Sequence, residues 1–151
     1  MHQLEPRGAD EYTVLIFFSI DCHVLGIHDE RVRKIATEYA ERGVRFFAVD
    51  AEVGATAARD RVEAARRGYP FPILIDGGAR IAREFGAEFA GHVVVLDRSG
   101  KTLYRGGIDS DRAHLTDGAT PFLADALVDL LAGRSPRVAE SKALGCALRT
   151  W

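Results

Sequence analysis

Two apolar runs and the helical pattern between them define the first half of the chain. Residues 12–18 and 44–50 are rich in β-branched and aromatic side chains, which is typical of strands buried on both faces. Residues 28–42 carry apolar side chains at helical spacing, and Gly43 is expected to end that helix. Two strands joined by a helix predict a right-handed βαβ unit with parallel strands.

The second half predicts shorter elements that finish with an antiparallel hairpin and a closing helix. Thr120 is the expected N-cap of that helix, and Pro121 is expected at its first helical position. Expected helices cover residues 56–67, 79–85 and 120–131, and expected strands cover 71–76, 92–97 and 101–105. The charged helix over 56–67 is interpreted as a solvated face. The predicted fold class is α/β, with a central mixed sheet that places chemistry at the carboxyl ends of its parallel strands.

The composition fits one globular domain. The chain has 151 residues, of which 47% are hydrophobic and 28% are charged. We expect a domain over residues 1–133 and a polar tail over 134–151. A formal net charge of -2 gives no general attraction to nucleic acid or to an anionic membrane. No basic segment followed by an apolar stretch opens the chain, so the cytoplasm is the expected compartment.

The two cysteines, Cys22 and Cys146, are the candidate chemistry. They are too few for a disulfide scaffold and do not form the C-x-x-C pair of a structural zinc site. Cys22 lies between a strand end and a helix start, where amide donors and the helix dipole favour a thiolate. A protonated His23 would add to that effect, Asp21 would oppose it, and Ser19 can offer a hydroxyl donor. The alternative is an inert, small apolar residue.

Residues 12–50, followed by the hairpin over 93–107, resemble the thioredoxin fold in its redoxin branch, which contains the alkyl hydroperoxide reductase and thiol-specific antioxidant proteins. The Gly145-Cys146 ending is similar to a bacterial subgroup of that branch. The resemblance implies a thiol-dependent redox protein in which Cys22 is the reactive thiol, with Ser19 and His23 assisting. It implies no organic cofactor and no metal, a peroxide or disulfide substrate, and a thioredoxin-type protein or small thiol as reductant.

Several positions depart from the patterns of these relatives. Leu25 stands where thioredoxins have the second cysteine of C-x-x-C, and Gly91 replaces the usual cis-proline before the late strand. Ser19 matches the Thr/Ser position of the peroxiredoxin motif, whereas Leu15 replaces its proline. These departures favour a second hypothesis, in which the chain is a binding or regulatory module that has lost the chemistry.

Cys146 is the candidate resolving thiol, because a second thiol can condense with a sulfenic acid at Cys22. A mobile tail would suit this role, and the bridge could form within one chain or link a homodimer. In the alternative, Cys146 packs under the tail with other apolar residues and never meets Cys22; those residues are Leu144, Leu148 and Trp151.

A copper or zinc site is a third hypothesis, with Cys22 and histidines drawn from His23, His28, His92 and His114. Carboxylates at predicted strand ends and turns, including Asp50, Asp76 and Asp109, are interpreted mainly as turn formers or N-caps.

Overall fold

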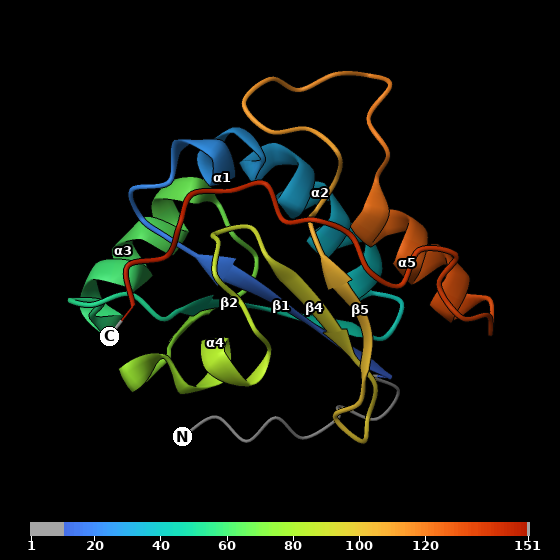
Figure 1. The fold of residues 1–151 in the computed structure, drawn as a ribbon, viewed down its shortest axis with the longest axis horizontal. Helices are drawn as coiled ribbons and strands as arrows, with labels where there is room; N and C mark the ends of the chain where they lie inside the picture. The colour runs from blue at the N-terminus through green and yellow to red at the C-terminus, as the bar shows by residue number, and fades with distance from the viewer. Residues whose placement is uncertain (1–10, 151) are drawn as a thin grey trace.

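A five-stranded mixed sheet organises the chain in the computed structural model, which describes residues 11–150 (Figure 1). The strands lie in the order β3-β2-β1-β4-β5. Their bounds are β1 Tyr12–Phe18, β2 Val44–Asp50, β3 Ile73–Ile75, β4 Val93–Leu96 and β5 Thr102–Gly106. Strands β1, β2 and β3 are parallel, whereas β4 pairs antiparallel with both β1 and β5.

The helices connect and cover these strands. They are α1 His23–Ile27, α2 Asp29–Ala40, α3 Ala57–Arg67, α4 Arg80–Glu84 and α5 Phe122–Leu131, with a 3-10 turn η1 at Gly77–Ala79. Figure 1 shows α2 and α5 on one side of the strands and α4 on the other. None of the helices in the described part of the chain is long and apolar enough to cross a membrane.

Strand β1 provides the centre of the core because both of its faces are buried. Val14, Ile16 and Phe18 point into the larger cluster, which α2 and α5 cover. Leu15 and Phe17 point into a second cluster, which alanines of η1 and α4 help to cover. Alternation of side chains along a strand explains this division. The residue pattern typical of a strand buried on both faces is thus confirmed.

The predicted βαβ unit and antiparallel hairpin are confirmed, while some predicted boundaries are wrong. The first helix starts earlier, as α1, and α2 begins only at Asp29, because His28 closes one helix and opens the next. Thr120 is not the N-cap of α5: Pro121 occupies that position with non-helical backbone angles. Thr120 is instead tied to Ser110, whose Oγ accepts from its N–H at 2.7 Å.

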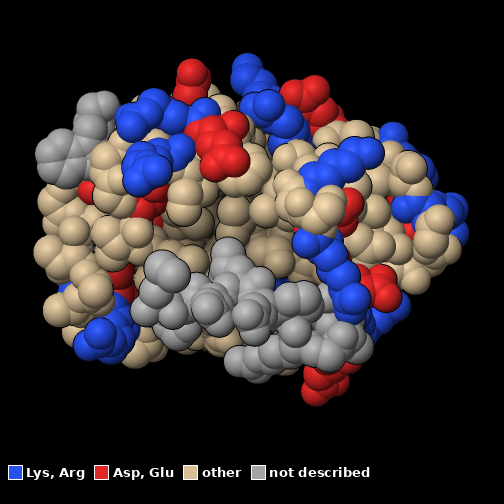
Figure 2. Space-filling model, turned by 90° about the horizontal axis from the view of Figure 1, so that it is seen from below, with Lys and Arg blue, Asp and Glu red and all other residues tan. Residues whose placement is uncertain are grey.

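The surface agrees with the near-zero net charge. Figure 2 shows basic and acidic side chains interspersed over the visible face of the molecule. Opposite charges at close spacing cancel one another at distances beyond about a Debye length of 8–10 Å. Charge on this face therefore does not indicate a polyanionic partner.

Candidate functional site

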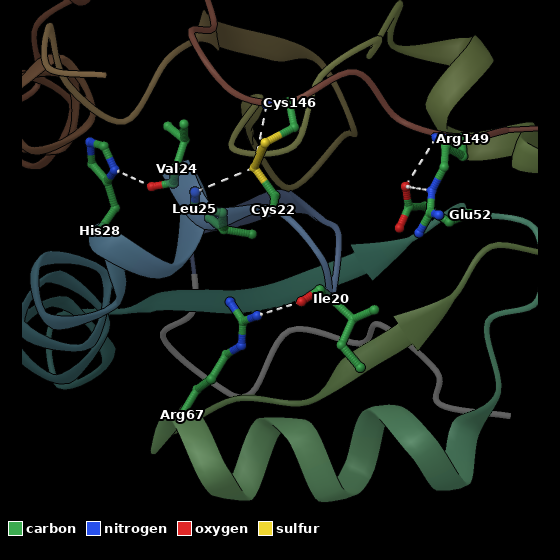
Figure 3. The surroundings of a disulfide bond; sticks show 9 residues. All are labelled: Ile20, Cys22, Val24, Leu25, His28, Glu52, Arg67, Cys146 and Arg149. Atoms are coloured by element: carbon green, nitrogen blue, oxygen red, sulfur yellow. Dashed lines mark hydrogen bonds and ion pairs between the residues drawn. A yellow bond between two sulfur atoms is a disulfide. The ribbon is translucent and has the colours of Figure 1, made fainter. Parts of the chain in front are cut away.

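Cys22 lies at the carboxyl end of β1, as the N-cap residue of α1 (Figure 3). Only 2% of its surface is exposed. Its Sγ accepts a hydrogen bond from the N–H of Leu25 at 3.4 Å. The predicted position between a strand end and a helix start is confirmed, and the first turn of α1 directs an amide donor at the sulfur.

Cys146 forms a disulfide with Cys22 in the same chain, across 124 residues of sequence. The two Cα atoms are 5.7 Å apart, and the N–H of Cys146 donates to the Sγ of Cys22 at 3.3 Å. The alternative in which Cys146 only anchors the tail is therefore wrong, although Leu148 does pack against both parts of the core. Trp151, named in that alternative, lies outside the described residues.

Backbone hydrogen bonds hold the tail at Cys146 and just after it. The carbonyl of Cys146 accepts from Ala90 N–H at 2.8 Å, and Leu148 N–H donates to the carbonyl of Glu88 at 2.9 Å. The residues between these bonds form an antiparallel bridge. Figure 1 shows the tail, in red, running across the end of the sheet from α5 towards α3. The tail around Cys146 is thus a bridged segment that is hydrogen-bonded to the domain, and its mobility stays a prediction.

A second attachment follows three residues after Cys146. The N–H of Arg149 donates to Glu52 Oε2 at 3.0 Å, and the carbonyl of Arg149 accepts from Val53 N–H at 2.8 Å. The Arg149 guanidinium reaches Asp21 Oδ2 at 2.6 Å. Figure 3 shows Arg149 and Glu52 facing each other beside the disulfide. The tail is therefore joined to the loops after both β1 and β2.

The other two predicted site residues differ in exposure. Ser19 is buried, and its backbone carbonyl accepts from the N–H of Cys22 at 3.2 Å. His23 is exposed as the first residue of α1. The thiolate-stabilising role of the Ser19 hydroxyl and the assisting role of His23 stay predictions.

Arg67 supports the loop that carries Cys22, and the sequence reasoning missed it. Its guanidinium donates to the carbonyl of Ile20 at 3.0 Å and lies over the ring of Phe18, 4.9 Å from the centroid. Only 4% of its side chain is exposed, and Glu63 pairs with it at 2.8 Å. The interpretation of α3 as a solvated face holds for its exposed residues but is wrong for the face that carries Glu63 and Arg67. Arg67 and Glu63 pair with each other on that buried face, so a charged sequence pattern did not mean that every charged residue is exposed.

A buried ion-pair network lies beyond α1. His28 donates from Nδ1 to the carbonyl of Val24 at 2.8 Å and from Nε2 to Asp109 at 3.1 Å. Burial alone would lower the pKa of His28, but these hydrogen bonds outweigh it and raise the pKa above its usual value. Burial alone would likewise raise the pKa of Asp109, but the hydrogen bonds from His28 and Arg31 hold it below its usual range. This network fastens the loop after β5 to the α1–α2 junction.

Asp50 ends β2 as a fully buried carboxyl group. Its Oδ1 accepts from the N–H of Glu52 at 3.0 Å, and Arg59 reaches its Oδ2 at 3.1 Å. Burial and the neighbouring Asp60 raise the pKa of Asp50 to about 7. Asp76 has the simpler capping role that was expected: its carboxylate accepts from two amides at the start of α4.

The metal hypothesis finds no support in the donor set. No group of three or more His, Cys, Asp or Glu side chains is arranged to hold a metal ion within residues 11–150. Both ring nitrogens of His28 already face oxygen acceptors. Burial together with Arg105 lowers the pKa of His92 to about 4, which keeps its imidazole neutral, but within residues 11–150 it belongs to no group of three or more such side chains. Cys22, the proposed soft ligand, is bonded to Cys146.

Comparison with known proteins identifies the family. The Redoxin family model matches residues 9–117. The chain therefore belongs to the Redoxin family, and the resemblance drawn from the sequence is confirmed at that level. No curated protein matches the chain.

Solved structures confirm the thioredoxin-like fold. An uncharacterized conserved protein from Geobacillus kaustophilus is 26% identical, with a TM-score of 0.85 over 94% of this chain and 78% of that one. A hypothetical protein from Sinorhizobium meliloti 1021 is 23% identical, with a TM-score of 0.85 over 95% and 81%. A secreted Mycobacterium tuberculosis disulfide oxidoreductase shares the fold at 14% identity, with a TM-score of 0.54 over 82% of each chain. Fold and family together indicate thiol–disulfide redox function.

Gly91 occupies the place at which the family resemblance predicts a proline. Its N–H donates to the carbonyl of Phe17 at 2.8 Å, and its φ of 85° lies in the left-handed region that favours glycine. Proline could neither donate this hydrogen bond nor adopt this φ. The backbone at Gly91 therefore differs from the one that a proline would require. The residue before it, Ala90, makes the hydrogen bond to the tail.

Proposed function

We propose that this protein is a thiol–disulfide oxidoreductase that cycles Cys22 and Cys146 between a dithiol and an intrachain disulfide. The observation that carries the proposal is the disulfide itself. It joins a sulfur at a helix start to a tail cysteine that hydrogen bonds hold in place. Two amide donors on the Cys22 sulfur would stabilise a thiolate there, so Cys22 suits the roles of both nucleophile and leaving group.

In the reducing half of the cycle, a reductant thiolate attacks Sγ of Cys146, which belongs to the more exposed residue of the pair. A new S–S bond forms between reductant and Cys146, the old one breaks, and Cys22 leaves as a thiolate. A second thiolate of the reductant then attacks its own sulfur in the mixed disulfide. The reductant departs oxidised, and Cys146 departs as a thiolate that takes a proton from water.

In the oxidising half, the Cys22 thiolate attacks one sulfur of a substrate disulfide and releases the other as a thiolate. Cys146, as a thiolate, then attacks Sγ of Cys22 and releases the second substrate thiolate. The substrate gains two electrons and the Cys22–Cys146 disulfide forms again. We propose a thioredoxin-type protein or a small thiol as the reductant. A peroxide is the competing substrate, since it would oxidise Cys22 to a sulfenic acid that Cys146 condenses with, releasing water.

Steady-state assays on three proteins test this proposal. Wild type, Cys22→Ser and Cys146→Ser are compared for reduction of a protein disulfide by dithiothreitol and for consumption of hydrogen peroxide. We expect disulfide reduction by wild type, background rates for Cys22→Ser, and an accumulating mixed disulfide for Cys146→Ser. Peroxide consumption without disulfide reduction would make the peroxide the substrate. Equal background rates in all three proteins for both substrates would overturn the enzyme proposal and favour the non-catalytic module.

A further inference from the structure

Glu52 lies at the centre of the contacts that hold the tail after Cys146. It follows β2 by two positions and is 4% exposed. Its Oε2 accepts from the backbone N–H of Arg149 at 3.0 Å and lies 3.5 Å from Nε of the same residue. Its Oε1 is buried and has no hydrogen-bond partner. Within residues 11–150, the donors that the structure gives this buried carboxylate therefore come from the tail.

Gly145 makes a second, independent fit between tail and domain. A Cβ built at this position would overlap the carbonyl oxygen of Ala90. The same Ala90 donates its N–H to the carbonyl of Cys146 at 2.8 Å. Only a residue without a side chain allows the tail to approach this closely. The approach in turn sets the position of the next residue, Cys146.

We propose that Glu52 and Gly145 are positioning residues that keep Cys146 beside Cys22 in the dithiol state and so set the redox equilibrium of the pair. A tail released from Glu52 would lose its attachment at Arg149, and Cys146 could then move away from Cys22. Holding two thiols together raises the effective concentration of one at the other and favours the disulfide. This inference rests on the proposed cycle and names the residues that would set its equilibrium between dithiol and disulfide.

The test is the equilibrium constant between the Cys22–Cys146 couple and glutathione, measured by thiol alkylation and mass spectrometry. We expect Glu52→Ala to shift the equilibrium about tenfold towards the dithiol, as loss of a hydrogen bond to a charged group implies. Glu52→Gln keeps an acceptor oxygen, so its equilibrium constant should lie closer to that of wild type than to that of Glu52→Ala. Gly145→Ala should shift the equilibrium at least as far, since its Cβ displaces the tail. Lys142→Ala, at an exposed position of the same tail, is the matched control and should match wild type.

Equilibrium constants for Glu52→Ala and Gly145→Ala within twofold of wild type would overturn this inference while leaving the cycle intact. Failure of the proposed function looks different. In that case wild type, Cys22→Ser and Cys146→Ser would show equal background rates with both substrates, whatever the glutathione equilibrium constants of the variants. Far-ultraviolet circular dichroism and urea unfolding of each variant, in the oxidised state, check that the domain remains folded.

Discussion

Cys22 and Cys146 are held in place by different kinds of contact. Cys22 follows a strand buried on both faces, and its own surface is 2% exposed, so hydrophobic packing fixes it. Cys146 belongs to a tail in which residues 134–150 form no helix or named strand; it lies at the edge of the core and is held mainly by a few backbone hydrogen bonds and by Glu52. Packing resists change because it sums many contacts. A handful of hydrogen bonds is easier to make and break, so the tail side is where redox chemistry can alter structure.

The largest expected effect comes from breaking the covalent link between the two regions. In the chain-entropy model, a crosslink across 124 residues contributes about 4–5 kcal/mol to stability. Reducing wild type with dithiothreitol should lower the free energy of unfolding in urea by about that amount. Cys146→Ser is the control and should be insensitive to the reductant. Equal stability of oxidised and reduced wild type would contradict a disulfide inside the folded domain.

The second largest effect concerns the core side, where the buried Asp50 should make the stability of the fold depend on pH. The pKa of Asp50 is raised from 3.8 to about 7, so the folded state keeps a proton that the unfolded state loses above pH 4. Stability should therefore fall as pH rises from 4 to 7, by at most about 1.4 kcal/mol per pH unit for this group. Asp50→Asn mimics the protonated carboxyl and should flatten this part of the urea-unfolding profile.

His28 provides an internal check on that profile. Because its pKa is raised, its contribution is present below pH 6.5 and is lost as pH rises through its folded pKa. Asp50→Asn should leave this later decline in place. A profile that keeps its full slope between pH 4 and 7 in Asp50→Asn would show that the carboxyl is not the group responsible.

A small core change should affect stability without affecting redox chemistry. Ile16 is 3% exposed within the larger core cluster, and Ile→Val changes of this kind cost about 0.5–1.5 kcal/mol. We expect Ile16→Val to lose that much stability in urea while its glutathione equilibrium stays within twofold of wild type. A redox shift as large as that of Glu52→Ala would remove the distinction between the two regions.

The smallest expected effect is at the exposed end of the tail attachment. Arg149 and Asp21 form an ion pair at 2.6 Å, but their side chains are 66% and 69% exposed. Exposed pairs contribute about 0–1 kcal/mol and are screened by salt. Asp21→Asn should therefore cost the oxidised protein less than about 1 kcal/mol in urea, and 1 M salt should abolish the difference. A larger, salt-independent loss would place the tail's main anchor at Asp21 instead of Glu52.

The sequence was sufficient for the parts of the fold that depend on local pattern. The apolar strand over residues 12–18 and the helix and strand after it predicted the βαβ unit, and with it the place of Cys22. The caps were harder, since Pro121 took the N-cap position once Ser110 held Thr120. That hydrogen bond joins residues ten apart across a loop, and local helix signals do not contain it.

The tail side was less predictable because its contacts join residues far apart in sequence. Pairing of the two cysteines was one of several open alternatives, since nothing in the tail pattern fixes which surface it meets. Glu52 and Arg149 are 97 positions apart, and Arg67 gained its role only when α3 packed beside the loop after β1. Gly145 was noted only for its resemblance to relatives, and its close approach to Ala90 could not be predicted from the tail pattern.

The most direct test is a single-turnover experiment on the reduced protein. Reduced wild type is mixed with half an equivalent of a disulfide substrate, quenched by acid, alkylated and mapped by non-reducing mass spectrometry. The proposed cycle predicts one Cys22–Cys146 disulfide for each substrate disulfide reduced, and none in Cys22→Ser. Substrate reduction without a Cys22–Cys146 disulfide, or no reaction in wild type, would contradict the account.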